Sequence, residues 1–386
     1  MMKKALFFAG LLLIVSCINK ETVTITPKLE QELCEQVYLN KPIKEPQYTV
    51  NTFIDAAIQK TVMKALTESV INNEARNGFV VVMETNTGKI KAMVSLERDN
   101  TQSKYLASNK MDINVPIEPG SLIKTFDLMS LLEDKKADTA TVYNAKGGEI
   151  SYLGKKIIDC HKGFKNITLG KAFLYSSNTV FVQAIDSAYR QNPIQFSNNF
   201  KKFGLNNDLQ LPFSHAKKGS VIPTPNSDSW SDISLPWMAF GYGINLTPVQ
   251  ILTYYNAIAN DGVMVKPLFL SKIESKEGET KEYSKIILNN SICSKSTITI
   301  LQDLLSRSMR DNSEKNHLSA QLALTNINYG SITSIKEYAS SLTGYFPSDK
   351  PKYTVFVYVK NSNKDKVSSK VDVAKIVFNK IAASIR

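Results

Sequence analysis

Ser121 and Lys124, within the sequence EPGSLIKTF, have the types and spacing of an activated nucleophile. Residues three apart on a helix lie on one face, so the lysine amine can come within hydrogen-bonding distance of the serine hydroxyl. A serine is a weak nucleophile until a base removes its proton, and a neutral lysine can be that base. The pair therefore predicts a serine site for acyl transfer.

The spacing by itself is not specific, because Ser214 and Lys217 repeat it in a polar, loop-like segment. The first pair has a different context. Pro119-Gly120 interrupts the chain just before it, and residues 121 to 132 then have the apolar pattern of a helix. Taken alone, an ordinary helix N-cap at Ser121 and a solvated lysine in the first turn are the simpler explanation of these residues.

Apolar periodicity predicts the helices and strands that must position this pair. Helical spacing is present in residues 53 to 70, 297 to 309 and 369 to 385. The sequence Thr85-Asn86-Thr87-Gly88 separates two apolar runs, which indicates a β-hairpin. The segment YTVFVYV, residues 353 to 359, is typical of a buried strand.

The predicted strands come from the two ends of the chain, and helices fill the middle. This order favours an α/β (α+β) fold, in which a sheet is flanked by helices and carries an inserted all-helical lobe at about residues 125 to 265. A cleft between the sheet and the lobe is where we expect the site.

The first seventeen residues have the pattern of an export signal. Lys3 and Lys4 precede an apolar run, residues 5 to 15, which is too short to span a bilayer as a permanent helix. The run ends in Ile14-Val15-Ser16-Cys17, which resembles the lipobox of bacterial lipoproteins and implies a lipid on Cys17. An uncleaved anchor or a plain secretion signal is the alternative. Residues 18 to 47 are polar and predict a tether to the body.

Composition excludes several classes of function. The 386 residues are 43% hydrophobic, which suits one large domain or two small ones. Beyond the signal, Cys34, Cys160 and Cys293 are odd in number, and neither they nor the three histidines have the spacing of a metal site, so we expect no metal and no cofactor. The net charge of +12 comes from scattered lysines without a recognition motif, which argues against nucleic acid.

Five segments in order resemble the transpeptidase domain of class B penicillin-binding proteins, over about residues 48 to 386. They are VVMETNTGKIKAMVSL, EPGSLIKTF, SSNTVFVQA from Ser176, FGYGINLTPVQILTYYNAIANDGVMVKP (240 to 267) and YASSLTGYFPSDKPKYTVFVYV (338 to 359). The Ser-x-Asn pattern alone is weak, since residues 197 to 199 also match it. The resemblance implies the penicillin-binding transpeptidase and serine β-lactamase-like fold, with an antiparallel sheet.

The resemblance also implies roles for single residues. Ser121 would attack the penultimate D-Ala of a peptidoglycan stem peptide or a β-lactam, and its N–H would form half of an oxyanion hole. Lys124 would be the general base, which requires its pKa to fall from about 10.4 toward about 7. Ser176 would relay a proton to the leaving amine, and Asn178 would hydrogen-bond the substrate amide.

The third family motif, Lys-Thr/Ser-Gly, is absent from the chain. Family spacing leads to Leu324-Thr325-Asn326-Ile327, where Leu324 replaces the lysine and Asn326 the glycine. Thr325 keeps the hydroxyl, and the Ile327 N–H could still serve an oxyanion. Loss of a charge-assisted hydrogen bond costs roughly 1.5–3 kcal/mol, which weakens substrate binding, and a side chain at the glycine position could block the stem peptide.

Three hypotheses follow from these motifs. The first is a D,D-transpeptidase or carboxypeptidase of the bacterial cell envelope, lipid-anchored outside the cytoplasm and associated with a cell-wall synthesis complex. The second is a catalytically impaired homologue that acts as a binding or scaffolding lipoprotein, suggested by the degenerate third motif. The third, less favoured, is a β-lactamase or β-lactam sensor, for which the sequence offers no identifiable deacylating base.

Overall fold

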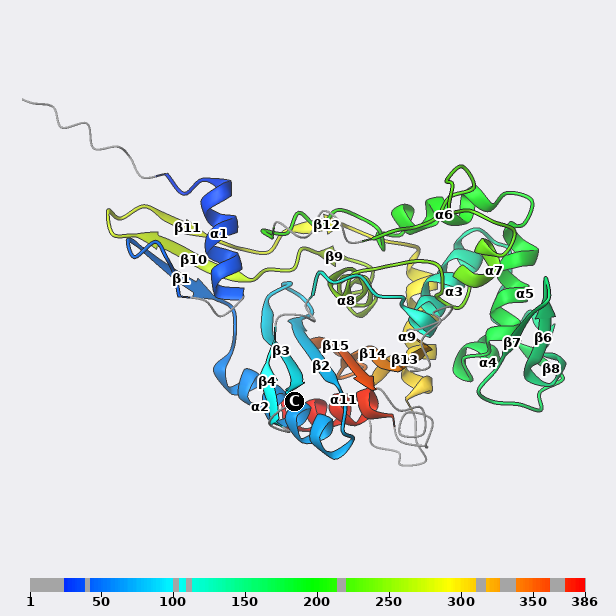
Figure 1. Ribbon diagram of the computed structural model, residues 1–386. Coiled ribbons are helices and arrows are strands. Elements are labelled where there is room, and N and C mark those ends of the chain that lie inside the picture. Colours follow the sequence, from blue (N-terminus) through cyan, green and yellow to red (C-terminus); the bar gives the residue numbers. More distant parts are fainter. Residues whose placement is uncertain are drawn as a thin grey trace, which may run out of the picture.

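A computed structural model of the chain describes residues 24–38, 42–99, 104–108, 113–213, 220–309, 317–326, 338–361 and 372–385. The signal segment with Cys17, the second Ser-x-x-Lys match and Ile327 lie outside these residues. Figure 1 shows a sheet with helices on both sides, a lobe rich in helices, and a small separate sheet near the N-terminal helix.

The central sheet has six antiparallel strands in the order β13-β14-β15-β2-β3-β4. Strands from both ends of the sequence lie side by side in it, as predicted (Figure 1). The bounds are β2 Asn77–Glu84, β3 Ile90–Asp99, β4 Lys104–Ala107, β13 Ser319–Asn326, β14 Tyr338–Phe346 and β15 Tyr353–Asn361.

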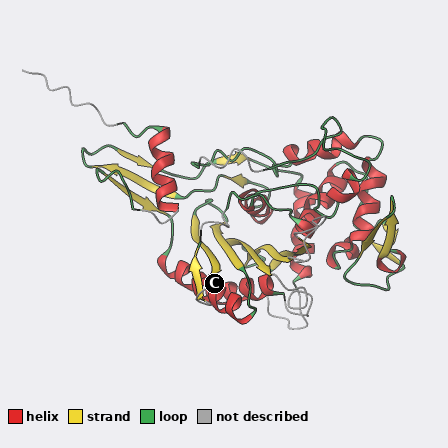
Figure 2. Cartoon of the chain, in the orientation of Figure 1, coloured by secondary structure: helices red, strands yellow, loops and turns green. Residues whose placement is uncertain are grey.

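Both faces of the sheet are covered, which explains the nearly continuous apolar sequence of β15. Val355, Val357 and other valines pack against helices α2 (Ala56–Asn72) and α11 (Val373–Ser384). Phe356 and Tyr358 face the opposite side, in the same core as helix α8 (Pro248–Ala259). The sheet therefore lies between two helical layers, and the lobe continues from the second of them (Figure 2).

The lobe has an aromatic centre. The ring of Phe126 lies 4.0 Å from that of Phe200 and 5.6 Å from that of Phe196, measured between centroids. These contacts join the first helix of the lobe to the helix that carries Phe196 and Phe200. The helices are α3 Lys124–Glu133, α4 Leu169–Leu174, α5 Asn178–Tyr189, α6 Pro193–Lys202, α7 Ser234–Met238 and α9 Lys295–Ser308, with the 3-10 turns η1 Gly120–Ile123 and η2 Lys146–Gly148.

The lobe also holds two small two-stranded sheets, which the prediction of an all-helical lobe left out. Strand β5 (Val142–Asn144) pairs with β8 (Asn166–Thr168), and β6 (Glu149–Tyr152) pairs with β7 (Lys155–Ile158). Leu153 and Gly154 join β6 to β7 with φ values of 47° and 74°. Two positive φ values are the geometry of a type I′ hairpin, so this turn was the missed signal.

The polar tether predicted for residues 18 to 47 is wrong for part of its length, because Pro27–Tyr38 forms helix α1. Leu33 and Cys34 in α1 are buried. The helix is held to a three-stranded sheet by the Ile25 N–H, which donates to Glu279 Oε1 at 3.0 Å, and by an ion pair between Lys281 and Glu30. The sheet consists of β1 Tyr48–Thr52, β10 Leu270–Ser275 and β11 Thr280–Glu282, and a separate strand pair is β9 Met264–Val265 with β12 Ile287–Asn289.

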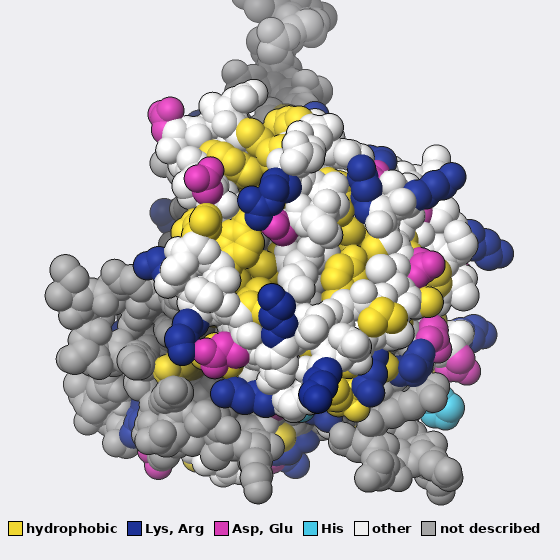
Figure 3. Space-filling view, turned by 90° about the vertical axis from the view of Figure 1, so that its right-hand side faces the viewer, with side chains coloured by type: hydrophobic (Ala, Val, Ile, Leu, Met, Phe, Trp, Pro, Cys, Tyr) yellow, Lys and Arg dark blue, Asp and Glu magenta, His cyan; other side chains and the backbone are white. Residues whose placement is uncertain are grey.

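The predicted helices and strands agree with the structure to within a few residues. The helix predicted at 53 to 70 is α2, the one at 297 to 309 is α9, and the hairpin is β2 and β3. Across the described ranges, no helix combines the length and apolar character needed to cross a bilayer. Figure 3 looks onto the lobe, where lysine and arginine side chains are dispersed among acidic and apolar ones.

Candidate active site

The nucleophile turn lies at the start of the lobe, where η1 leads directly into α3. The Lys124 Nζ atom lies 3.1 Å from Ser121 Oγ, as the three-residue spacing predicts. It also lies 3.0 Å from Ser176 Oγ, 2.6 Å from the Ser176 carbonyl oxygen and 2.6 Å from Asn178 Oδ1. The four residues predicted from the first and second motifs therefore converge on one nitrogen.

The four oxygen atoms suit a neutral amine. An ammonium has three donors and no acceptor, whereas a neutral amine has two N–H groups and one lone pair. The Ser176 carbonyl and Asn178 Oδ1 can only accept, and they are the two shortest contacts, so they hold the two N–H groups. The lone pair is then directed toward the hydroxyls of Ser121 and Ser176, from either of which it can accept a proton.

Burial prepares Lys124 to be a base. The side chain is fully buried, and desolvation lowers its pKa to about 8, against the opposing effects of Asp159, Cys160 and Asp127. Ser121 is only partly buried and remains accessible from outside. The site therefore places the accessible hydroxyl of Ser121 beside the buried amine of Lys124, whose pKa lies near neutral pH.

The second motif occupies the tight turn between α4 and α5. Ser176 has a φ of 51°, a left-handed conformation that is uncommon for a residue with a side chain. Ser177 then caps α5, with its hydroxyl accepting from the Val180 N–H at 3.2 Å. Asn178 begins the helix and donates from Nδ2 to the Ile158 carbonyl at 2.9 Å. The turn directs both Ser176 oxygens and Asn178 Oδ1 toward Lys124.

The segment FGYGINLTPVQILTYY packs against the nucleophile turn and forms hydrogen bonds with its backbone. Gly241 has a φ of 83°, and the Gly120 N–H donates to its carbonyl at 3.2 Å. A Cβ at position 241 would lie 2.1 Å from the Gly120 carbonyl oxygen, so only glycine fits. Further along, the Tyr255 hydroxyl donates to the Leu122 carbonyl at 2.8 Å. Two separate contacts therefore fix the backbone on either side of Ser121.

Strand β13 is the edge strand beside the nucleophile turn. A Cβ at Gly120 would lie 2.5 Å from Thr325 Oγ1 and 3.4 Å from Ala323 Cβ, so both side chains face the turn. Successive strand residues face opposite sides, and Leu324, 42% exposed, points away. Leu324 therefore lies on the face of the strand opposite to Thr325, and its assignment to the lysine position stays a prediction.

The other residues of the degenerate motif are placed only in part. Thr325 is buried, with its hydroxyl against Gly120, and Asn326 ends β13. Ile327 lies outside the described residues, so the substrate-binding roles of Thr325, Asn326 and Ile327 stay predictions. The sequence of β13, SAQLALTN, contains no lysine or arginine in any register.

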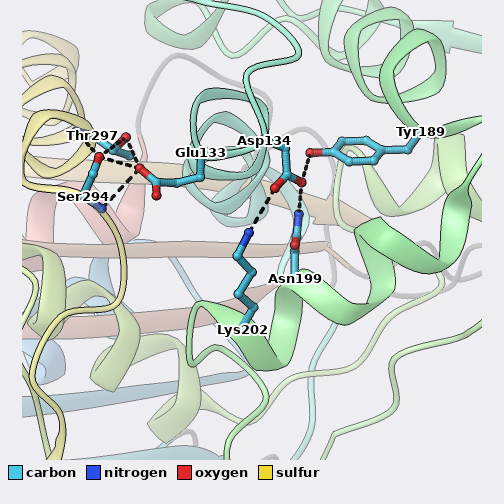
Figure 4. A network of polar contacts seen from close by, with 7 residues as sticks. All are labelled: Glu133, Asp134, Tyr189, Asn199, Lys202, Ser294 and Thr297. Carbon is cyan, nitrogen blue, oxygen red and sulfur yellow. Dashed lines mark hydrogen bonds and ion pairs between the residues drawn. The ribbon is translucent and has the colours of Figure 1, made fainter.

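The far end of α3 is anchored by two carboxylates (Figure 4). Glu133 accepts from the hydroxyls of Ser294 and Thr297 at 2.6 and 2.5 Å. Burial alone would raise the pKa of the Glu133 carboxyl, but these hydrogen bonds outweigh it and lower the pKa. The neighbouring Asp134 accepts from the side chains of Tyr189, Asn199 and Lys202, at 2.9, 2.7 and 3.0 Å.

Asp127 is a buried carboxyl that the motifs did not predict. It lies on α3, three residues after Lys124, and is fully buried. Neither of its side-chain oxygens has a hydrogen-bond partner within the described part of the chain. Burial raises the pKa of Asp127 well above its ordinary value, against the opposing effect of Lys124. Burial therefore favours the protonated form of this carboxyl.

Comparisons with known proteins identify the family of the chain. The family model described as the penicillin binding protein transpeptidase domain matches residues 78–383. The chain belongs to this family.

Two relatives give finer detail. A peptidoglycan D,D-transpeptidase FtsI of Buchnera aphidicola is 28% identical over 343 residues, which cover 85% of this chain and 56% of the relative. Penicillin-binding protein PbpB of Mycolicibacterium smegmatis is 28% identical over 244 residues, which cover 61% and 36%. The chain thus spans little more than half the length of the first relative and about a third of the length of the second.

Solved structures show the same fold. Penicillin-binding protein 3 of Mycobacterium tuberculosis, complexed with aztreonam, has a TM-score of 0.72 at 20% identity over 87% of this chain and 78% of that one. The transpeptidase domain of Burkholderia pseudomallei penicillin-binding protein 3 has a TM-score of 0.69 at 20% identity, over 86% and 95%.

We predict that Gly241→Ala displaces the nucleophile turn, whereas Gly243→Ala does not. Both glycines have positive φ, which costs alanine roughly 1–2 kcal/mol. Position 243 has open space, but a Cβ at 241 meets the Gly120 backbone and adds a steric cost of about 1–3 kcal/mol. Urea unfolding should show the larger loss of stability for Gly241→Ala. Equal losses in the two variants would contradict the close approach.

Asp127 predicts a pH-dependent loss of stability. Because its pKa is raised in the folded state, the native chain binds more protons than the unfolded chain, and the free energy of unfolding falls as pH rises above the ordinary aspartate pKa of about 4. In Asp127→Asn this fall should be smaller. The free energy of unfolding of the variant, measured with urea, should therefore rise relative to that of the wild type between about pH 5 and pH 7. Asp303→Asn, an exposed aspartate on α9, is the control. The same pH slope in wild type and Asp127→Asn would refute a raised pKa.

Proposed function

We propose that the chain is a serine acyltransferase of the peptidoglycan D,D-transpeptidase type, which binds β-lactams and acts on D-Ala-D-Ala stem peptides through an acyl-Ser121 intermediate. The observation that carries the proposal is the position of Lys124 Nζ, fully buried and within 3.1 Å of the hydroxyls of both Ser121 and Ser176. Family membership supports the same class of reaction.

The geometry supports a definite sequence of proton transfers. Lys124 accepts the Ser121 proton while the serine oxygen attacks the carbonyl carbon, and the N–H groups at the start of the helix stabilise the negative oxygen. The leaving amine then needs a proton. Ser176 lies on the other side of the same nitrogen, at 3.0 Å, so it passes a proton to the amine and takes one back from Lys124. Water or an acceptor amine later releases the acyl group by the reverse path.

A second function is a binding or scaffolding homologue with weak catalysis. It is favoured by β13, which has no lysine or arginine to attract a substrate carboxylate and exposes Leu324 instead. In this reading the chain is catalytically impaired, because affinity for the carboxylate of a stem peptide or a β-lactam is low.

We also propose that a lipid on Cys17 holds the chain on the membrane, on the outer side of the cytoplasmic permeability barrier, where stem peptides and a cell-wall synthesis complex would be accessible. Support comes from the sequence alone, namely the two lysines, the short apolar run and the small residues before Cys17.

Covalent labelling tests the proposed function. The full-length chain in detergent should form a stable fluorescent band with a fluorescent penicillin, because Ser121 attacks the lactam carbonyl as it would a peptide. Ser121→Ala should abolish the band while the unfolding transition is retained, and Ser214→Ala, in the second Ser-x-x-Lys match, should leave it unchanged. A folded wild type without a band, beside a labelled family member, would favour the scaffolding function.

The acylation rate should rise with pH, with a midpoint near 8. Below the Lys124 pKa the amine is an ammonium that cannot accept a proton, and above it the base is free. The measurement is the second-order acylation rate constant between about pH 6 and pH 9.5, with unfolding checked at each pH. A rate that is flat over this range would exclude Lys124 as the titrating base.

A further inference from the structure

Asp159 lies directly behind the second motif, and no motif in the sequence points to it. It follows β7, is 3% exposed, and accepts three hydrogen bonds. Ser177 Oγ donates to it at 2.6 Å, Thr179 Oγ1 at 3.0 Å and the Thr179 backbone N–H at 2.8 Å. Ser177 and Thr179 flank Asn178, so the carboxylate holds the chain on both sides of that residue.

The neighbouring backbone completes this clamp. Ile158, just before Asp159, accepts from Asn178 Nδ2 at 2.9 Å, which leaves Asn178 Oδ1 directed at Lys124. Ser176, on the other side of Ser177, has a strained φ of 51° that local sequence preference would not maintain. The contacts from the β6–β7 hairpin therefore hold the turn in a form in which both Ser176 oxygens and Asn178 Oδ1 reach Lys124 Nζ.

The carboxylate is also well placed electrostatically. It accepts from the first turn of α5, where a helix favours negative charge. Burial has the largest effect on the pKa of Lys124 and lowers it. The negative charge of Asp159 acts in the opposite direction and raises this pKa, as do the charges of Cys160, in the same loop, and of Asp127, on α3. Loss of the charge and loss of the oxygen contacts on Lys124 would both lower the pKa of Lys124, because each stabilises the ammonium.

We propose that Asp159 is a positioning residue for the acyl-transfer reaction, which holds Ser176 and Asn178 against Lys124 through Ser177 and Thr179. The proposal rests on the proposed function for its kinetic consequences. The structural part of the proposal is that contacts from the β6–β7 hairpin position the oxygen atoms around Lys124. This part does not depend on any substrate.

The test is Asp159→Asn, with Asp138→Asn as the matched control. Asp138 makes the same kind of contacts, accepting from the backbone N–H groups of Ala140 and Thr141 and from the Thr141 hydroxyl, all within three residues of itself. With fluorescent penicillin, Asp159→Asn should lower the high-pH plateau of the acylation rate by at least about tenfold and move the midpoint to lower pH, whereas Asp138→Asn should change neither. An unchanged plateau or an unmoved midpoint in Asp159→Asn would overturn the proposal.

A second variant keeps the test decisive if Asp159→Asn does not fold. Thr179→Val removes one hydrogen bond to Asp159 and retains the carboxylate and its charge. It should lower the plateau by about threefold to tenfold, since a neutral hydrogen bond is worth about 1 kcal/mol. An unchanged plateau in a folded Thr179→Val would count against the clamp.

Failure of the proposed function can be separated from failure of this inference. An NMR titration of the lysine Cε signals, assigned with Lys124→Arg, reports the Lys124 pKa without any substrate. If the wild type is not acylated, the proposed function fails, yet a lower Lys124 pKa in Thr179→Val than in wild type still supports the clamp, because this variant keeps the Asp159 charge. Identical titrations would refute it.

Discussion

The desolvation of one amine is the constraint on which the rest of the site depends. Lys124 is fully buried, and an ammonium there would be costly, so its pKa falls to about 8. A buried amine still needs partners for its N–H groups. The Ser176 carbonyl and Asn178 Oδ1 supply them, from a helix that begins more than fifty residues later. The base is therefore competent only when two distant segments are held together.

The architecture brings those segments together from several directions. Edge strand β13 and the Gly241 loop fix the backbone at Gly120, and Tyr255 on α8 fixes it after Ser121. The opposite end of α3 is tied to α5, α6 and α9 through Glu133 and Asp134. The η1 turn and helix α3, which carry Ser121 and Lys124, are thus held at both ends, and this limits displacements that would separate the two side chains.

Sequence reasoning found the parts of this site that repeat locally. Helical spacing and the Pro119-Gly120 break located Ser121 and Lys124, and the β-branched and aromatic residues of β15 located a strand of the sheet. It missed what depends on distant contacts. Asp159 stands eighteen residues before its partner Ser177 in a segment without periodicity. Helix α1 was also missed, although Leu29, Leu33 and Val37 recur every four residues, because prolines and polar residues dominated that reading. Which side chains of β13 face the nucleophile turn could be determined only from the packing of the strand against Gly120.

The altered strand and the intact base bear on different steps. Nucleophile activation involves α3 and the turn before α5, and β13 takes no part in the hydrogen bonds to Lys124 Nζ. A strand without a cation weakens the attraction of a carboxylate but leaves proton removal from Ser121 untouched. Holding Lys124 with its pKa lowered to about 8 by burial costs folding stability at low pH. A pure scaffold gains nothing from that cost, whereas an acyltransferase requires it, so the buried lysine supports the acyl-transfer function proposed above.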